Sequence, residues 1–193
     1  MAVIRAFIAI SLPEPLQRKL EEVINGLKGR LGNGAVRWVT GANIHLTLKF
    51  LGDVSPANLE MLKKIMQAEA SAHPAFEIGV GGLGAFPSMH RPRVIWVKVG
   101  APPALKALQR GIEHETTRLG YDREDRAFSP HLTLGRVNRS ASPREIQQIG
   151  ELLEQTTLGP VGVVKVEQVS LYRSDLRPGG AIYTCLFSAP LGH

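Results

Sequence analysis

Residues 43–50 read Asn-Ile-His-Leu-Thr-Leu-Lys-Phe, and the central tetrapeptide, His45-Leu46-Thr47-Leu48, returns as residues 131–134. In an extended strand alternate side chains share a face, so the histidine and threonine of each copy look one way and the two leucines look the other. The leucines then pack inward while the polar pair is displayed. The pattern predicts two half-buried strands that each present an imidazole and a hydroxyl.

The repeat extends beyond the tetrapeptides. The two histidines stand 86 residues apart (131 − 45), and Pro13 and Pro102, which open two predicted helices, stand 89 apart (102 − 13). Each half has the order strand, proline-started helix, His-x-Thr strand and Ser-Pro-started helix, the last beginning at Ser55 and Ser142. We infer an internal duplication within a single domain, residues 1–193. The expected fold is α+β and bilobal, with two antiparallel sheets, helices on their outer faces and a central cleft.

Two further local patterns bear on the fold. Ser142 and Glu145 have the spacing of a capping box at the start of a helix. Residues 79–84 fit the dinucleotide-binding pattern G-x-G-x-x-G, but Phe86-Pro87-Ser88 follow where that motif needs a helix N-terminus. We therefore expect bends at these glycines and no dinucleotide site.

Composition limits the class of protein. A chain of 193 residues with 44% hydrophobic content can bury a sizeable core. Its 23 Lys and Arg exceed its 17 Asp and Glu, a formal charge of +6, which favours an anionic partner such as nucleic acid. No apolar run reaches the roughly 20 residues that span a bilayer. The lone cysteine, Cys185, excludes an internal disulfide and fits a reducing compartment, so we expect a soluble cytoplasmic protein.

The doubled motif suits acid–base chemistry on a phosphate. An imidazole titrates near neutrality, so one ring can accept a proton from water while the other donates a proton to a leaving oxygen. Threonine hydroxyls can hold the non-bridging oxygens of a phosphate as their charge grows. The sequence has no P-loop pattern and no Cys/His ligand set, and we therefore expect no metal and no cofactor.

Besides the doubled motif, further stretches carry a family likeness: Arg5–Ile10, Trp38, Phe50–Gly52, Pro92–Trp96, Phe128–Pro130 and Leu171–Ser174. Together they make the chain resemble the 2H phosphoesterase superfamily, and within it the RNA 2′,3′-cyclic phosphodiesterases, also called 2′-5′ RNA ligases. The resemblance implies a bilobal arrangement and hydrolysis of a 2′,3′-cyclic phosphate at an RNA end to a 2′-phosphate. It also implies 2′-5′ RNA ligation as a reverse-type activity.

The resemblance assigns His45 and His131 as the catalytic residues and Thr47 and Thr133 as phosphate-binding residues. Our hypothesis is that His45 protonates the departing ribose 3′ oxygen while His131 activates the attacking water. Because the two motifs are identical, the sequence leaves these two roles interchangeable.

For residues that follow the two motifs, the alternation alone does not decide whether the side chain reaches the cleft. Family members place a phosphate-binding arginine at the position of Arg136, but strict alternation puts Arg136 on the face opposite His131. We expect it to reach the cleft only if the strand twists or bulges after Gly135. Lys49 shares the parity of His45, so it either adds charge to the cleft or lies solvated at the strand end.

The aromatic residues near the motifs are candidates either for base stacking or for the core. Phe128 either stacks on a terminal base, as aromatic rings do on single-stranded RNA, or packs in the core ahead of the second motif. The core is also the expected place of three other rings, those of Trp38, Phe50 and Trp96.

The expected partner is RNA with a 2′,3′-cyclic phosphate end, or a nucleotide 2′,3′-cyclic phosphate. A monomer is expected because a duplicated chain supplies both halves of its own cleft. Three alternatives stay open at this point: an enzyme acting on small nucleotides or 2′-5′ oligonucleotides, a non-catalytic RNA-binding module, and a structural protein with a repeated fold.

Overall fold

The computed structural model describes residues 3–32, 34–177 and 180–192. In these ranges nine strands form one sheet in the order β7-β4-β5-β6-β3-β1-β8-β9, with β2 also paired to β6. The strands are β1 (Ile4–Ser11), β2 (Val36–Trp38), β3 (His45–Val54), β4 (Phe76–Phe86), β5 (Val94–Val99), β6 (His131–Val137), β7 (Pro160–Val166), β8 (Gln168–Arg177) and β9 (Gly180–Pro190). The helices are α1 (Glu14–Leu31), α2 (Leu59–Ser71), α3 (Pro103–Arg118) and α4 (Pro143–Gln155), with 3₁₀ turns η1 (Gly41–Asn43) and η2 (Pro56–Asn58).

The order of the strands reflects the duplication. From the centre outward, one half of the sheet runs β6, β5, β4, β7 and the other runs β3, β1, β8, β9, so each half begins with a His-x-Thr strand. The halves meet where β3 pairs antiparallel with β6 through Leu46 and Leu132. The predicted α+β duplicated architecture is confirmed, and its two antiparallel sheets are joined edge to edge into one.

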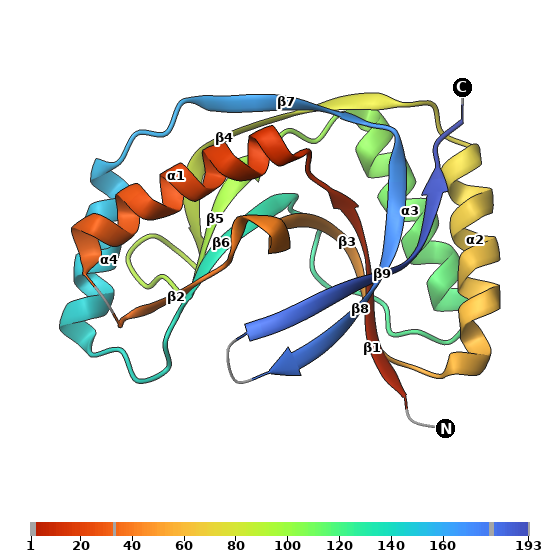
Figure 1. The fold of residues 1–193 in the computed structure, drawn as a ribbon, viewed down its shortest axis with the longest axis horizontal. Coiled ribbons are helices and arrows are strands. Elements are labelled where there is room, and N and C mark those ends of the chain that lie inside the picture. Colours follow the sequence, from red (N-terminus) through yellow and green to blue (C-terminus); the bar gives the residue numbers. More distant parts are fainter. Residues whose placement is uncertain (1–2, 33, 178–179, 193) are drawn as a thin grey trace.

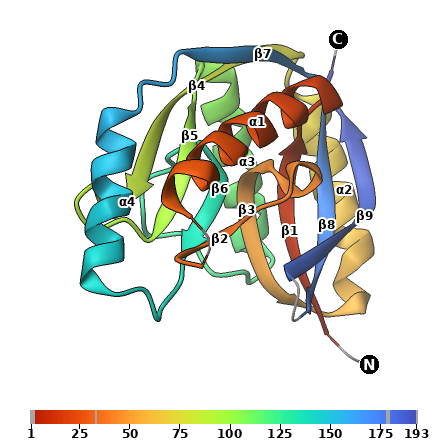
Figure 2. The same cartoon turned by 60° about the vertical axis from the view of Figure 1, so that its left-hand side comes forward.

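The helices are exchanged between the halves. α1 follows β1 but packs against β7 and α4, whereas α3 follows β5 but packs against β3 and α2. Figure 1 shows α1 and α4 beside the half that contains β5 and β6, and α2 and α3 beside the half that contains β1. The rotated view in Figure 2 keeps this grouping. Each half of the sheet is therefore covered by one helix from each half of the sequence.

The helices begin where the sequence places prolines and polar caps. α1 and α3 start directly after the prolines at 13 and 102. The predicted capping box opens α4: the Ser142 hydroxyl accepts from the Glu145 amide at 3.3 Å, and the Glu145 carboxylate accepts from the Ser142 amide at 2.7 Å. The other Ser-Pro start differs from the prediction, because Pro56 opens the 3₁₀ turn η2 and α2 follows that turn.

The leucines of both tetrapeptides lie in one hydrophobic core. Leu46, Leu48, Leu132 and Leu134 are all buried in a cluster that runs through both halves of the sheet. The opposite face of β3 and β6 keeps its polar side chains accessible. We call it the open face. Among the described helices, none is both long enough and apolar enough to cross a bilayer.

The glycine-rich run at 79–84 lies inside β4 and not before a helix, so the rejected dinucleotide motif is absent from this segment. The bends that the glycines allow take the form of a bulge against β5 between Val80 and Leu83. Gly84 is needed for packing, since a Cβ there would come within 2.1 Å of the Trp96 ring across the ladder.

Candidate active site

The two motif strands share one pattern of burial and one irregularity. Residues 45–51 of β3 and 131–137 of β6 alternate between buried and accessible in the same order, and both alternations break at the same place. The extra residue that interrupts the ladder with the neighbouring strand is Leu48 in β3 and Leu134 in β6. A bulge of this kind changes the face to which the following side chains point.

The register between β3 and β6 brings the four motif side chains together. Continuing the antiparallel bridge by one residue on each side sets His45 opposite Thr133 and Thr47 opposite His131. Directly opposed residues have Cβ atoms about 5 Å apart, and diagonal ones about 7–8 Å apart. Each imidazole thus lies across the strand pair from the hydroxyl of the other motif, and all four side chains belong to the open face.

Both imidazoles are held in the same way. His45 Nδ1 lies 2.7 Å from the Asn43 carbonyl oxygen, and His131 Nδ1 lies 2.7 Å from the Ser129 carbonyl oxygen. Because a carbonyl oxygen only accepts, each Nδ1 carries the hydrogen, and Nε2 of the neutral ring is left with a lone pair. Within the described residues neither Nε2 makes a hydrogen bond inside the protein. Each ring therefore offers an Nε2 base.

Aromatic rings from neighbouring strands enclose the histidines. Phe7 stacks on His45 with ring centroids 4.7 Å apart, and Tyr183 meets the same imidazole edge-on at 5.1 Å. Phe86 meets His131 edge-on at 4.9 Å. The sequence analysis gave none of these three rings a role in the site, since only the pairing of β1, β4 and β9 into the sheet brings them to the motifs.

This environment sets the charge of the rings. Burial lowers the pKa of His45, and the hydrogen bond to the Asn43 carbonyl opposes that shift only in part. Burial also lowers the pKa of His131, and the positive charge of Arg136 lowers it further. For both imidazoles the lowered pKa favours the neutral form in the free protein.

Arg136 lies on the open face. The bulge at Leu134 reverses the alternation, so that Arg136 is exposed while both Gly135 and Val137 are buried. The bulge that the sequence analysis required occurs one residue earlier than expected, before Gly135. That glycine also has no room for a side chain, since a Cβ would lie 2.9 Å from the Trp38 ring.

The equivalent bulge in β3 overturns two expectations. Lys49 is only 4% exposed and points toward the helices, where its Nζ lies 2.6 Å from Glu113 Oε1 and also donates to the Asp122 carbonyl. It neither charges the cleft nor lies solvated. Phe50, assigned to the core, is 65% exposed and stands where Arg136 stands in β6.

The other aromatic residues divide between the two faces. Trp38 packs against the core as expected, but Trp96 lies on the open face, with its ring 6.2 Å from that of His131. Phe128 is half-buried and packs against the core. Within the described residues Phe128 forms no ring pair, so the structure places it beside the core and not against either histidine.

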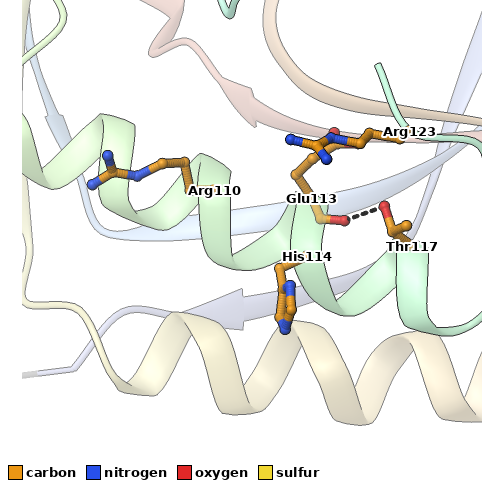
Figure 3. A pocket seen from close by; sticks show the side chains of 5 residues that line it. All are labelled: Arg110, Glu113, His114, Thr117 and Arg123. Atoms are coloured by element: carbon orange, nitrogen blue, oxygen red, sulfur yellow. Dashed lines mark hydrogen bonds between the residues drawn. The ribbon is translucent and has the colours of Figure 1, made fainter. Parts of the chain in front are cut away.

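A separate pocket of about 350 Å³ lies on the outer side of α3, away from the motif residues. It is lined by Arg110, Glu113, His114, Thr117 and Arg123. Figure 3 shows the Arg110 side chain pointing away from Glu113 and Arg123. Its cationic side chains do not converge. Across the described residues, no three His, Cys, Asp or Glu side chains gather closely enough to hold a metal ion.

A duplicated α+β fold with a His-x-Thr strand at the inner edge of each half, where the halves meet, is the fold of a two-histidine phosphoesterase. The family described as LigT like Phosphoesterase matches residues 10–96 and 98–183, and the chain belongs to this family. The two matched segments begin 88 residues apart (98 − 10), close to the separation of the two histidines. The match thus repeats the duplication that the motifs predict.

Similar proteins cover nearly the whole chain. An RNA 2′,3′-cyclic phosphodiesterase of Methanothermobacter thermautotrophicus is 36% identical over 94% of this chain and 95% of its own length. That of Escherichia coli is 31% identical over 94% and 93%. Among solved structures, TT0787 of Thermus thermophilus matches with a TM-score of 0.80 and 27% identity over 97% of both chains. E. coli LigT complexed with 3′-AMP matches with a TM-score of 0.76 and 28% identity over 99% of both.

Proposed function

We propose that the chain hydrolyses 2′,3′-cyclic phosphates, at the ends of RNA or in single nucleotides, to 2′-phosphates. The observation that carries the proposal is the pairing of β3 with β6, which gathers two Nε2 bases and two hydroxyls on one face. Acid–base opening of a strained phosphodiester needs such groups. The name shared by the relatives, RNA 2′,3′-cyclic phosphodiesterase, supports this substrate class.

In the proposed mechanism water attacks phosphorus as His131 takes its proton, and the bond from phosphorus to the ribose 3′ oxygen breaks as His45 gives that oxygen a proton. The product is a 2′-phosphate with a free 3′-hydroxyl. Thr47 and Thr133 donate hydrogen bonds to the non-bridging oxygens as negative charge grows there. The charge of Arg136 favours a neutral His131, which supports the role of base for that ring, and Arg136 also attracts the phosphate.

The proposal treats residues 1–193 as a single bilobal domain that acts as a monomer. One sheet and one hydrophobic core that run through both halves support this, as does the supply of both motifs by one chain. A cytoplasmic location fits the single exposed cysteine, Cys185. The net charge of +6 fits an RNA partner.

The pH dependence of kcat/KM follows from the burial of the two rings. The productive free enzyme has one imidazole protonated and the other neutral, so activity peaks between their two pKa values. Because burial lowers both pKa values from the usual 6.5, the bell-shaped profile should be centred below pH 6.5. Initial rates on 2′,3′-cyclic AMP across the acid and neutral range test this, and a bell centred above pH 6.5 would contradict it.

Phe50 is better placed than Phe128 to stack on a base. Its ring is 65% exposed on the open face, with a centroid 6.2 Å from that of Phe7, which itself stacks on His45. Because stacking on an aromatic ring contributes to the binding of each base, Phe50→Ala should raise KM about tenfold with little change in kcat.

The matched control is Phe128→Ala, which removes a ring packed against the core. This variant should have a lower free energy of unfolding and a KM close to that of wild type. Steady-state kinetics and urea unfolding of both variants separate the two rings. A raised KM in Phe128→Ala with an unchanged KM in Phe50→Ala would return the stacking role to Phe128.

The proposed function is tested by incubating the purified protein, in the presence of a chelator, with 2′,3′-cyclic AMP and with a short RNA that ends in a 2′,3′-cyclic phosphate. The expected product in both cases is the 2′-phosphate. A 3′-phosphate would mean that the other ester bond breaks, and would reject the mechanism. RNA binding without any turnover would favour the non-catalytic module. Competition between the two substrates distinguishes an RNA enzyme from one that acts on small nucleotides.

A further inference from the structure

Two arginines face each other beside the motif residues. In the antiparallel pair of β2 and β6, Arg37 lies directly opposite Arg136, so their side chains leave the sheet on the same face. Both residues are exposed, and their Cβ atoms are about 5 Å apart in such a pair. The open face thus carries a second concentration of positive charge, next to the imidazoles.

The charges of this arginine pair are directed toward the cleft. Burial raises the pKa of the Tyr183 phenol, and the positive charges of Arg136 and Arg37 both oppose that rise. Tyr183 lies edge-on against His45, so the arginine pair lies beside the site.

Like charges directly opposed across a ladder destabilise it. Within the described residues, neither arginine has a carboxylate partner in an ion pair. An anion that binds between them would relieve this repulsion. A guanidinium group is suited to such an anion because its planar fork donates two hydrogen bonds to one phosphate.

We propose that Arg37, together with Arg136, binds a second phosphate of the substrate, the one that joins the terminal nucleotide to the rest of the RNA. The inference rests on the proposed function, which places the cyclic phosphate between the two imidazoles. Arg136 lies three residues beyond Thr133 on β6, a rise of roughly 7–10 Å, so the arginine pair meets the backbone next to the reacting phosphate. Arg37 then determines the preference for an oligonucleotide over a mononucleotide.

The test compares wild type, Arg37→Ala, Arg37→Lys and the control Arg144→Ala, which removes an exposed charge from the first turn of α4. Substrates are 2′,3′-cyclic AMP and a trinucleotide that ends in a 2′,3′-cyclic phosphate. Loss of one charge-assisted contact should lower kcat/KM of Arg37→Ala about tenfold for the trinucleotide and leave that for 2′,3′-cyclic AMP within about twofold. For the trinucleotide, the slope of log kcat/KM against log salt is negative, and in Arg37→Ala its magnitude should be smaller by about 0.7. Arg37→Lys should recover part of the loss, and Arg144→Ala should match wild type.

Equal losses on both substrates, or no loss on either, would overturn the role of Arg37. Binding of a trinucleotide that ends in a 2′-phosphate is measured in parallel, by fluorescence anisotropy. If wild type turns over neither substrate, the proposed function fails. The binding measurement then still decides whether the arginine pair binds a phosphate of the RNA backbone. Weaker binding by Arg37→Ala than by Arg144→Ala supports it, and equal binding by the two variants contradicts it.

Discussion

Replacing His45 or His131 by alanine is expected to lower kcat on 2′,3′-cyclic AMP by about 10²–10⁴-fold, the contribution of a positioned general acid or base. The double variant should be little slower than either single variant, because the two rings act together in one transition state. Steady-state rates and urea unfolding midpoints of the three variants separate a loss of chemistry from a loss of fold.

The surviving pH dependence of each variant assigns the two roles. Removing the base should abolish the acidic limb of the rate–pH profile, and removing the acid should abolish the alkaline limb. Our assignment predicts that His131→Ala loses the acidic limb and His45→Ala the alkaline one. The reverse result would exchange the roles. His114→Ala, which alters a 71% exposed ring on α3, is the control and should keep wild-type rates. Wild-type rates in both motif variants would instead favour the structural reading of the repeat.

Lys49→Ala is expected to lower the free energy of unfolding by about 3–5 kcal/mol, the usual result of removing one partner of a buried ion pair. The Lys49 side chain is 2% exposed and that of Glu113 is 16% exposed. The substitution leaves the Glu113 carboxylate buried without its cation, and among the described residues its Oε2 already lacks a hydrogen-bond partner. Urea unfolding, followed by far-UV circular dichroism, measures the change.

Two further variants sharpen this prediction. Lys63→Ala breaks an exposed ion pair with Glu60 and should leave the unfolding midpoint unchanged. The double variant Lys49→Met with Glu113→Leu should regain most of the lost stability, because apolar side chains of similar size can replace a buried ion pair. Folded Lys49→Ala should keep its activity, since Lys49 points away from the open face. A normal midpoint with lost activity would place this lysine in the cleft.

Much of the architecture was predictable because its local signals agree. The prolines at 13 and 102, the capping box at Ser142 and the alternation around His45 and His131 each determine a local structure by short-range physics. The repeat then implies which elements correspond. The exchange of α1 and α3 between the halves, and the joining of two sheets into one, depend on long-range packing, and the sequence carries no local signal for either.

The residues after each motif show where strand alternation fails. The structure places Lys49 in the core, Phe50 in solvent and Arg136 on the open face because β3 and β6 each contain an extra residue. A signal for this bulge was present. In the second copy the apolar residues fall at positions 132, 134 and 137, and the final step of three breaks the period of two. In the first copy Phe50 continues that period and hides the same break before Leu51.

The central claim is that one phosphate group contacts both motifs at once. The most direct test is a crystal structure with adenosine 2′-phosphate, the expected product. The account predicts phosphate oxygens within hydrogen-bond distance of Nε2 of His45, of Nε2 of His131 and of both threonine hydroxyls. A phosphate bound instead in the pocket beside His114 and Arg123, with no ligand between the two imidazoles, would contradict it.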